Sequence, residues 1–308
     1  MSRVAIVGGA GRVGVSFAFH FLTQDVCKEI VLIDIAEDVL KGERLDLMHA
    51  SSSCGDTRFI AGADPALLAG ADVIVLPAGA RRRADQSRLE LIKTNVGIID
   101  IWMEHIAKHN PGAIVLVVVN PVDVLTYRAY MKGGKNRQRI FGLGNVMDVV
   151  RFRSIMGEHF DWNPMHVGAY LLGEHGDGMV PVWSQVNYAG LRVHDMPGID
   201  PEKLKQVYTE CRSAGADVIR LKGGAGWAVG VAITEVVRSI LMDEKRVLCV
   251  STIPDGDFGI AGDVALSLPT IVGRSGVEGY IHCTLDETET EGLKNAANVL
   301  RETYQQVA

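Results

Sequence analysis

The feature that most constrains the fold is an alternation of short apolar runs with helical stretches over residues 1–142. Apolar runs occupy residues 4–7, 30–33, 73–76 and 113–119, and a long amphipathic stretch at 89–109 ends in Asn-Pro-Gly. Strands that are apolar on both faces are typical of a parallel sheet covered by helices on both sides. Right-handed connections between such strands produce a doubly wound sheet. We therefore predict an α/β fold for this part of the chain.

The pattern changes after residue 142. Helical periodicity covers residues 146–160, 201–222, 228–242 and 286–306, and strand-like runs lie at 167–172, 180–186, 246–252 and 265–272. These elements are mixed without the strict alternation of the first half, which predicts a smaller α+β domain. The glycine-rich joint Gly142-Leu143-Gly144 divides the chain into predicted domains 1–142 and 143–308.

A glycine motif follows the first apolar run. Residues 9–14 read Gly-Ala-Gly-Arg-Val-Gly, open a helical stretch, and precede Asp34, which ends the next strand twenty residues after Gly14. Strand, motif, helix and acid together are typical of a Rossmann dinucleotide site, whereas a glycine turn alone would be weak evidence. The glycines let the backbone approach a pyrophosphate, and Asp34 accepts the ribose hydroxyls and repels a 2′-phosphate, which favours NAD over NADP. The candidate cofactor residues are Gly9, Gly11, Arg12, Val13, Gly14 and Asp34, joined by Asn95, Val119 and Asn120.

Composition excludes several classes of function. The net charge of −6 and the absence of a basic block argue against nucleic acid as a partner. The five cysteines form no C-x-x-C pair, so neither a disulfide framework nor a metal site is expected, and reduced thiols suggest the cytoplasm. No apolar run reaches the roughly 20 residues of a membrane span, and the first strand leaves no room for a signal peptide.

A cluster of arginines follows the strand at 73–76. Arg81, Arg82, Arg83 and Arg88 lie within eight residues in a chain of negative net charge. A charge run is often only a solvated loop. Its place at the carboxyl edge of a parallel sheet, where ligands bind, favours instead a lid that presents guanidinium groups to carboxylates.

Four further residues make up a candidate catalytic set. Asn120 ends the strand at 113–119, Asp148 and Arg151 lie three apart in a predicted helix, and His175 is flanked by glycines in Gly173-Glu174-His175-Gly176-Asp177. An aspartate can orient a histidine and favour its charged form, while an arginine can hold a carboxylate. Taken singly, Asp148 and Arg151 could form a structural salt bridge and His175 could be a surface residue. Together they supply the groups required for carbonyl reduction.

With these motifs, the chain closely resembles the NAD-dependent lactate/malate dehydrogenase family over nearly its whole length. The resemblance extends through Lys222-Gly223-Gly224 and the run from Ser267 to Arg274. It implies that His175 is the proton donor and acceptor and that Asp148 is its partner. It also implies that Arg151 binds the substrate's C1 carboxylate, Arg88 polarises the carbonyl, and Asn120 orients substrate and nicotinamide. A homodimer or homotetramer is implied as well.

The resemblance also leads to a specific substrate prediction. Arg82 lies at the lid position that meets the C3 substituent of the substrate, where related lactate enzymes carry glutamine, and Ala225 lies where they usually carry threonine. A guanidinium facing a second carboxylate forms a charge-assisted pair, which favours a dicarboxylate substrate. We therefore expect a malate dehydrogenase that interconverts (S)-malate and oxaloacetate in the tricarboxylic acid cycle. The alternatives are an L-lactate or broader 2-hydroxy-acid dehydrogenase, in which Arg82 points to solvent, and a non-catalytic dinucleotide-binding protein.

Overall fold

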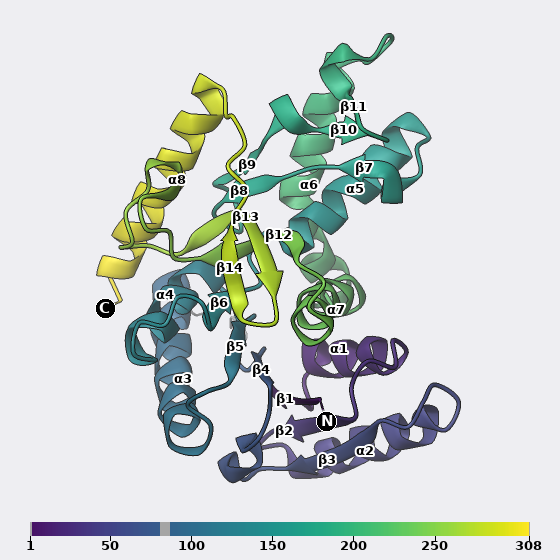
Figure 1. Cartoon of the computed structure of the whole chain (residues 1–308), viewed down its shortest axis with the longest axis vertical. Helices are drawn as coiled ribbons and strands as arrows, with labels where there is room; N and C mark the ends of the chain where they lie inside the picture. Colours follow the sequence, from purple (N-terminus) through teal and green to yellow (C-terminus); the bar gives the residue numbers. More distant parts are fainter. Residues whose placement is uncertain (1, 81–86, 308) are drawn as a thin grey trace.

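The first half of the chain forms a parallel sheet. The computed structural model describes residues 2–80 and 87–307, with only the backbone described at Arg88. Six strands pair in the order β3-β2-β1-β4-β5-β6, all parallel (Figure 1). Their bounds are β1 (Arg3–Val7), β2 (Glu29–Ile33), β3 (Arg58–Gly62), β4 (Val73–Leu76), β5 (Ile114–Val117) and β6 (Ile140–Gly142). This order confirms the predicted doubly wound sheet.

Helices cover both faces of the parallel sheet, as the apolar strands require. In β1, Val4 and Ile6 pack into one core with α1 (Arg12–Leu22), α2 (Glu37–Ser51) and α7 (Trp227–Met242), while Ala5 and Val7 pack into a second core with α3 (Arg88–His109) and α4 (Val122–Lys132). Alternate residues of a strand point to opposite faces, so one short strand contributes to both cores. Because α7 comes from the second half of the chain, its packing in this core joins the two halves.

The sheet continues without a break into the second half. Strand β12 pairs with β6 through Ser251 and Gly142, and the order runs on as β12-β13-β8-β9, all antiparallel, with β14 also paired antiparallel to β13, at Thr270–Gly273. A separate antiparallel sheet has the order β11-β10-β7. The strands are β7 (Val167–Gly168), β8 (Leu171–Gly173), β9 (Met179–Pro181), β10 (Asn187–Tyr188), β11 (Leu191–Arg192), β12 (Arg246–Thr252), β13 (Leu266–Gly273) and β14 (Gly276–Tyr280). The helices are α5 (Val146–Phe160), α6 (Pro201–Lys222), α7 and α8 (Glu287–Gln305).

This mixture of antiparallel strands and helices agrees with the predicted class of the second half. The expected strand at 180–186 is wrong beyond residue 181, because a 3-10 turn at Trp183–Gln185 replaces it. There the Ser184 N–H and hydroxyl both donate to the Glu289 carboxylate of α8, at 2.9 Å each, so this backbone amide is not available to a strand ladder. The domain division at residue 142 stays a prediction.

None of the helices in the described part of the chain is both long and apolar enough to cross a membrane. The five cysteines are free.

Candidate active site

The glycine loop lies at the carboxyl end of β1, where the first helix begins. Gly8 has φ +95°, and a side chain on Gly14 would overlap the carbonyl oxygen of Gly8. Helix α1 begins at Arg12 with Gly11 as its N-cap and no side chain capping it. The first N–H groups of a helix lack partners within the helix and attract anions. The loop therefore has the close backbone and open donors that a pyrophosphate requires.

Asp34 lies directly after β2 beside this loop. Its Oδ2 accepts a hydrogen bond from the Ala10 N–H at 3.1 Å, and its Oδ1 accepts one from the Ala36 N–H at 3.0 Å. A carboxylate has about four lone-pair sites, so each oxygen can still accept a ribose hydroxyl. The residues predicted from the sequence for the diphosphate and ribose thus lie together and fit an NAD molecule.

The loops after β4 and β5 contain or contact three predicted cofactor residues, Asn95, Val119 and Asn120. Asn95 is 1% exposed, its Oδ1 accepts from the Ala80 N–H at 2.8 Å, and its Nδ2 donates to the Asn120 carbonyl at 2.9 Å. Val119 is buried against Gly79, at which a Cβ would overlap it. Asn95 therefore joins the loop after β4 to the loop after β5, and Asn120 is the exposed member of the group.

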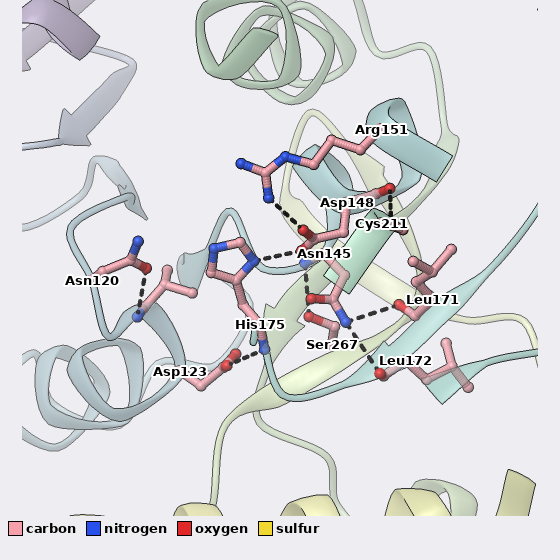
Figure 2. Close-up of polar contacts among 11 residues, drawn as sticks. Asn120, Asp123, Asn145, Asp148, Arg151, Leu171, Leu172, His175, Cys211 and Ser267 are labelled. Atoms are coloured by element: carbon pink, nitrogen blue, oxygen red, sulfur yellow. Dashed lines mark hydrogen bonds and ion pairs between the residues drawn. The ribbon is translucent and has the colours of Figure 1, made fainter. Parts of the chain in front are cut away.

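Asp148 is the centre of the candidate catalytic set. It lies in the first turn of α5 and is 1% exposed. Its Oδ1 accepts from Arg151 Nη1 at 2.8 Å, and its Oδ2 lies 2.5 Å from His175 Nδ1 (Figure 2). Both uses considered for Asp148, the salt bridge and the partnership with histidine, are therefore made by one carboxylate. In Figure 2 the His175 ring lies between Asn120 and Asp148.

A second carboxylate, that of Asp123, holds the loop that carries His175. The His175 backbone N–H donates to Asp123 Oδ2 at 2.7 Å, and Asp123 is 2% exposed. Gly173 and Gly176 adopt φ +82° and +152°, angles that L side chains rarely take. These glycines let the chain leave β8 sharply, so that His175 turns back towards α5.

Charge and burial set the proton affinities of this site. Burial opposes the charged form of His175, but the Asp148 carboxylate outweighs it, and the pKa of His175 is raised above its ordinary value. Burial likewise opposes ionisation of Asp148, yet His175 and Arg151 lower the pKa of Asp148. For Asp123, burial raises the pKa to about 6, and the hydrogen bond from the His175 N–H only partly opposes this. The arrangement favours a charged His175 beside an ionised Asp148.

Two supporting residues were not predicted from the sequence. Asp123 follows Asn120 by three residues and has no local pattern that indicates its role. Asn145 is fully buried; its Nδ2 donates to the carbonyls of Leu171 and Leu172 at 3.2 and 3.1 Å, and its N–H donates to Ser267 Oγ at 2.9 Å (Figure 2). It ties α5 to β8 just before the histidine loop. A buried polar residue of this kind has no local signature in the sequence.

Two residues of the predicted lid, Arg82 and Arg88, have no described side chain. Arg82, with the rest of residues 81–86, lies outside the described residues. Arg88 begins α3 after Ser87, whose hydroxyl and backbone form a capping box with Glu90, but its side chain is outside the described part.

Comparison with known proteins identifies the family. The family profile described as "lactate/malate dehydrogenase, NAD binding domain" matches residues 2–142, and the one described as "lactate/malate dehydrogenase, alpha/beta C-terminal domain" matches residues 146–308. This chain belongs to the lactate/malate dehydrogenase family. Its cofactor is accordingly NAD, as the glycine loop and Asp34 predicted.

Relatives of this family member include lactate enzymes. It is 38% identical to the L-lactate dehydrogenase A chain of Lycodichthys dearborni, with 97% of this chain and 91% of that protein covered. Identity to the L-lactate dehydrogenase B chain of Sceloporus undulatus is also 38%, over 97% and 90% of the two chains. A crystal structure of a lactate dehydrogenase from a Medee basin deep-sea metagenome library superimposes with a TM-score of 0.95, at 30% identity, over 99% of this chain and 98% of that one.

These relatives contradict the malate dehydrogenase prediction. The expected oxaloacetate substrate and role in the tricarboxylic acid cycle were derived from Arg82 and Ala225, two positions of which the first is outside the described residues. The similarity to L-lactate dehydrogenases extends over 97% of the chain. The alternative prediction, an L-lactate or broader 2-hydroxy-acid dehydrogenase, is the better supported one.

Proposed function

We propose that this protein is an NAD-dependent L-lactate dehydrogenase that also accepts related 2-hydroxy acids. The observation that supports it most is the single buried carboxylate of Asp148, which bonds both Arg151 and His175. In a 2-oxo acid the carboxylate carbon C1 is bonded directly to the carbonyl carbon C2. Arg151 can bind the carboxylate and charged His175 can face the carbonyl. Because Asp148 holds both side chains, their spacing suits such a substrate.

Arg151 binds the C1 carboxylate of the substrate. Its Nη1 is paired with Asp148, and neither Nε nor Nη2 makes a hydrogen bond to a residue in the described ranges. A carboxylate can therefore occupy the remaining edge of the guanidinium in the geometry that this group prefers. The Arg151 side chain is 15% exposed, so little water competes.

His175 transfers the proton. Its Nδ1 faces Asp148, which leaves Nε2 for the substrate oxygen. In reduction, the charged imidazole donates from Nε2 to the carbonyl oxygen; in oxidation, the neutral ring accepts the hydroxyl proton there. Asp148 keeps Nδ1 protonated throughout, so that the other nitrogen always points at the substrate. Arg88 polarises the carbonyl, and Asn120 orients the substrate.

NAD, when bound, supplies and accepts the hydride at C2 of the substrate. The residues that hold it are those of the glycine loop (Gly9, Gly11, Arg12, Val13, Gly14) together with Asp34, Val119 and Asn120, while Asn95 holds the loop that carries Asn120. The substrate domain is residues 143–308. We extend the proposal to a cytoplasmic homodimer or homotetramer, since enzymes of this family are typically oligomeric. The molar mass of the purified protein, measured by light scattering, distinguishes a dimer from a tetramer.

The test is NADH consumption by the purified protein with pyruvate, 2-oxobutyrate and oxaloacetate. We expect turnover of pyruvate and a higher kcat/KM for it than for oxaloacetate. His175→Asn should lower kcat at least 1000-fold without changing NADH affinity, because only the proton donor is lost. His282→Asn is the matched control, since His282 also pairs with an aspartate, Asp257, but on an exposed loop. Absence of turnover with every monocarboxylic 2-oxo acid, or a preference for oxaloacetate, would refute the proposal.

A further inference from the structure

Arg12 links the glycine loop to a segment more than two hundred residues away. Its guanidinium Nη1 donates to the carbonyl of Lys222 at 3.0 Å and to that of Gly224 at 2.7 Å. The alkyl part of the side chain lies against Gly226, where an added Cβ would stand 3.2 Å from Arg12 Cγ. The first residue of the cofactor helix α1 therefore holds the junction between α6 and α7.

The end of α6 is a suitable place for this arginine. Lys222 is the last residue of the helix, and Gly223 caps it in the left-handed conformation. The last carbonyls of a helix have no partners within it and carry a partial negative charge. Arg12 forms no ion pair with any residue that the structure describes, so this helix end is the main group that balances its charge.

The same helix touches the catalytic set. The Cys211 thiol lies 3.6 Å from the Asp148 carbonyl oxygen, to which it donates, and a Cβ built on Gly215 would lie 3.4 Å from Arg151 Nη1. Cys211 and Gly215 are four residues apart and so share one face of α6. That face supports Asp148 and Arg151, and the end of α6 that Arg12 holds is seven residues beyond Gly215, about 10 Å along the axis.

We propose that Arg12 is a positioning residue that couples occupancy of the cofactor phosphate loop to substrate binding at Arg151, through α6. The inference rests on the proposed function, since it assigns a role in the same reaction. Arg12 Nε and Nη2 make no hydrogen bond to residues 2–80 or 87–307, so a diphosphate at the start of α1 can bind them while Nη1 keeps its two carbonyls. A bound diphosphate then fixes the guanidinium, the end of α6 and the support of Arg151.

Coupling of this kind is reciprocal: if cofactor tightens substrate binding, substrate tightens cofactor binding by the same factor. The experiment measures the dissociation constant of NADH by fluorescence, with and without saturating oxamate, a non-reducible isostere of pyruvate. The proteins are the wild type, Arg12→Lys and Arg12→Met. Arg220→Met is the matched control, because Arg220 lies in the last turn of α6 but pairs with Asp217 of its own helix.

We expect oxamate to tighten NADH binding to the wild type and to Arg220→Met by the same factor. In both Arg12 variants that factor should fall at least tenfold. The ammonium group of Arg12→Lys retains the charge and should preserve most of the affinity for NADH alone. Its donors all lie on one nitrogen, however, so it cannot bridge two carbonyls on one side and a phosphate on the other as the planar guanidinium can. Loss of affinity with an unchanged coupling factor in the Arg12 variants would show that Arg12 is a phosphate ligand only, and would overturn the inference.

A second measurement needs no ligand. Hydrogen exchange of the free protein should be faster over residues 219–226 in Arg12→Met than in the wild type, and unchanged in Arg220→Met, because the last turn of α6 loses its external partner. Equal exchange in all three proteins would overturn the inference. Failure of the proposed function is distinguishable from both results, since it would appear in the wild type as a lack of pyruvate reduction.

Discussion

Replacement of Asp123 by asparagine tests how the site is supported. Asp123 Oδ2 accepts the His175 N–H, while Oδ1 and the hydroxyl of Ser251 are buried without a hydrogen-bond partner within the described residues. Asparagine has the same shape and can accept the same N–H through its own oxygen. The substitution therefore removes the buried charge and keeps the contact.

The size of the effect follows from the pKa. Burial raises the pKa of Asp123 from 3.8 to about 6, so the folded protein binds this proton more tightly than the unfolded chain. Below about pH 4 the carboxyl group is protonated in both the folded and the unfolded protein, so it does not change the free energy of unfolding. As pH rises through 6, the folded state must ionise a buried group, and stability falls by about 3 kcal/mol. This figure already includes the hydrogen bond from the His175 N–H, because that bond is one of the effects that set the pKa of Asp123. Asp123→Asn should thus stabilise the protein by up to about 3 kcal/mol above pH 7.

The assay is urea unfolding followed by tryptophan fluorescence between pH 4.5 and 8, at one fixed protein concentration because assembly contributes to apparent stability. The difference between Asp123→Asn and the wild type should grow as pH rises and level off above about 7. Asp100→Asn is a control of opposite sign: Asp100 pairs with Arg128, which lowers the pKa of Asp100, so this substitution should destabilise at neutral pH. A difference for Asp123→Asn that does not vary with pH would refute the reasoning.

Three further predictions concern the proton, the partner of the histidine and the cofactor. Because the pKa of His175 is raised, pyruvate reduction should stay constant up to a pH above the ordinary histidine value and fall beyond it, while lactate oxidation rises over the same range; an ordinary titration near pH 6.5 in the free enzyme would contradict this. Asp148→Asn should lower kcat at least 100-fold and move the loss of reduction to lower pH, since His175 and Arg151 lose their common charge; an unchanged pH profile would count against it. Gly14→Ala should abolish NADH binding measured by fluorescence, because the methyl group overlaps Gly8, whereas Gly42→Ala, with open space around it, should bind normally.

The incorrect malate prediction depended largely on one residue, Arg82. The preference for a dicarboxylate was inferred from charge complementarity at Arg82, which is sound chemistry for a side chain that faces the substrate. The direction in which a side chain faces is decided by tertiary packing and not by its neighbours in the sequence. The similarity to L-lactate dehydrogenases extends over 97% of the chain and outweighs an inference from one position.

The sequence by itself determined the features that depend on neighbours along the chain. The apolar strands, the glycine loop before Asp34, the bounds of α6 and the three-residue spacing of Asp148 and Arg151 follow from periodicity and backbone preference, which act over a few residues. Tertiary structure decided everything that joins distant segments. It brought Asp123 under the His175 loop, placed Arg12 on the end of α6, and turned residues 183–185 out of the sheet through Glu289. The physical reason is the same in each case: a buried polar group is satisfied by whichever partner the packed chain presents, and that partner has no fixed distance in the sequence.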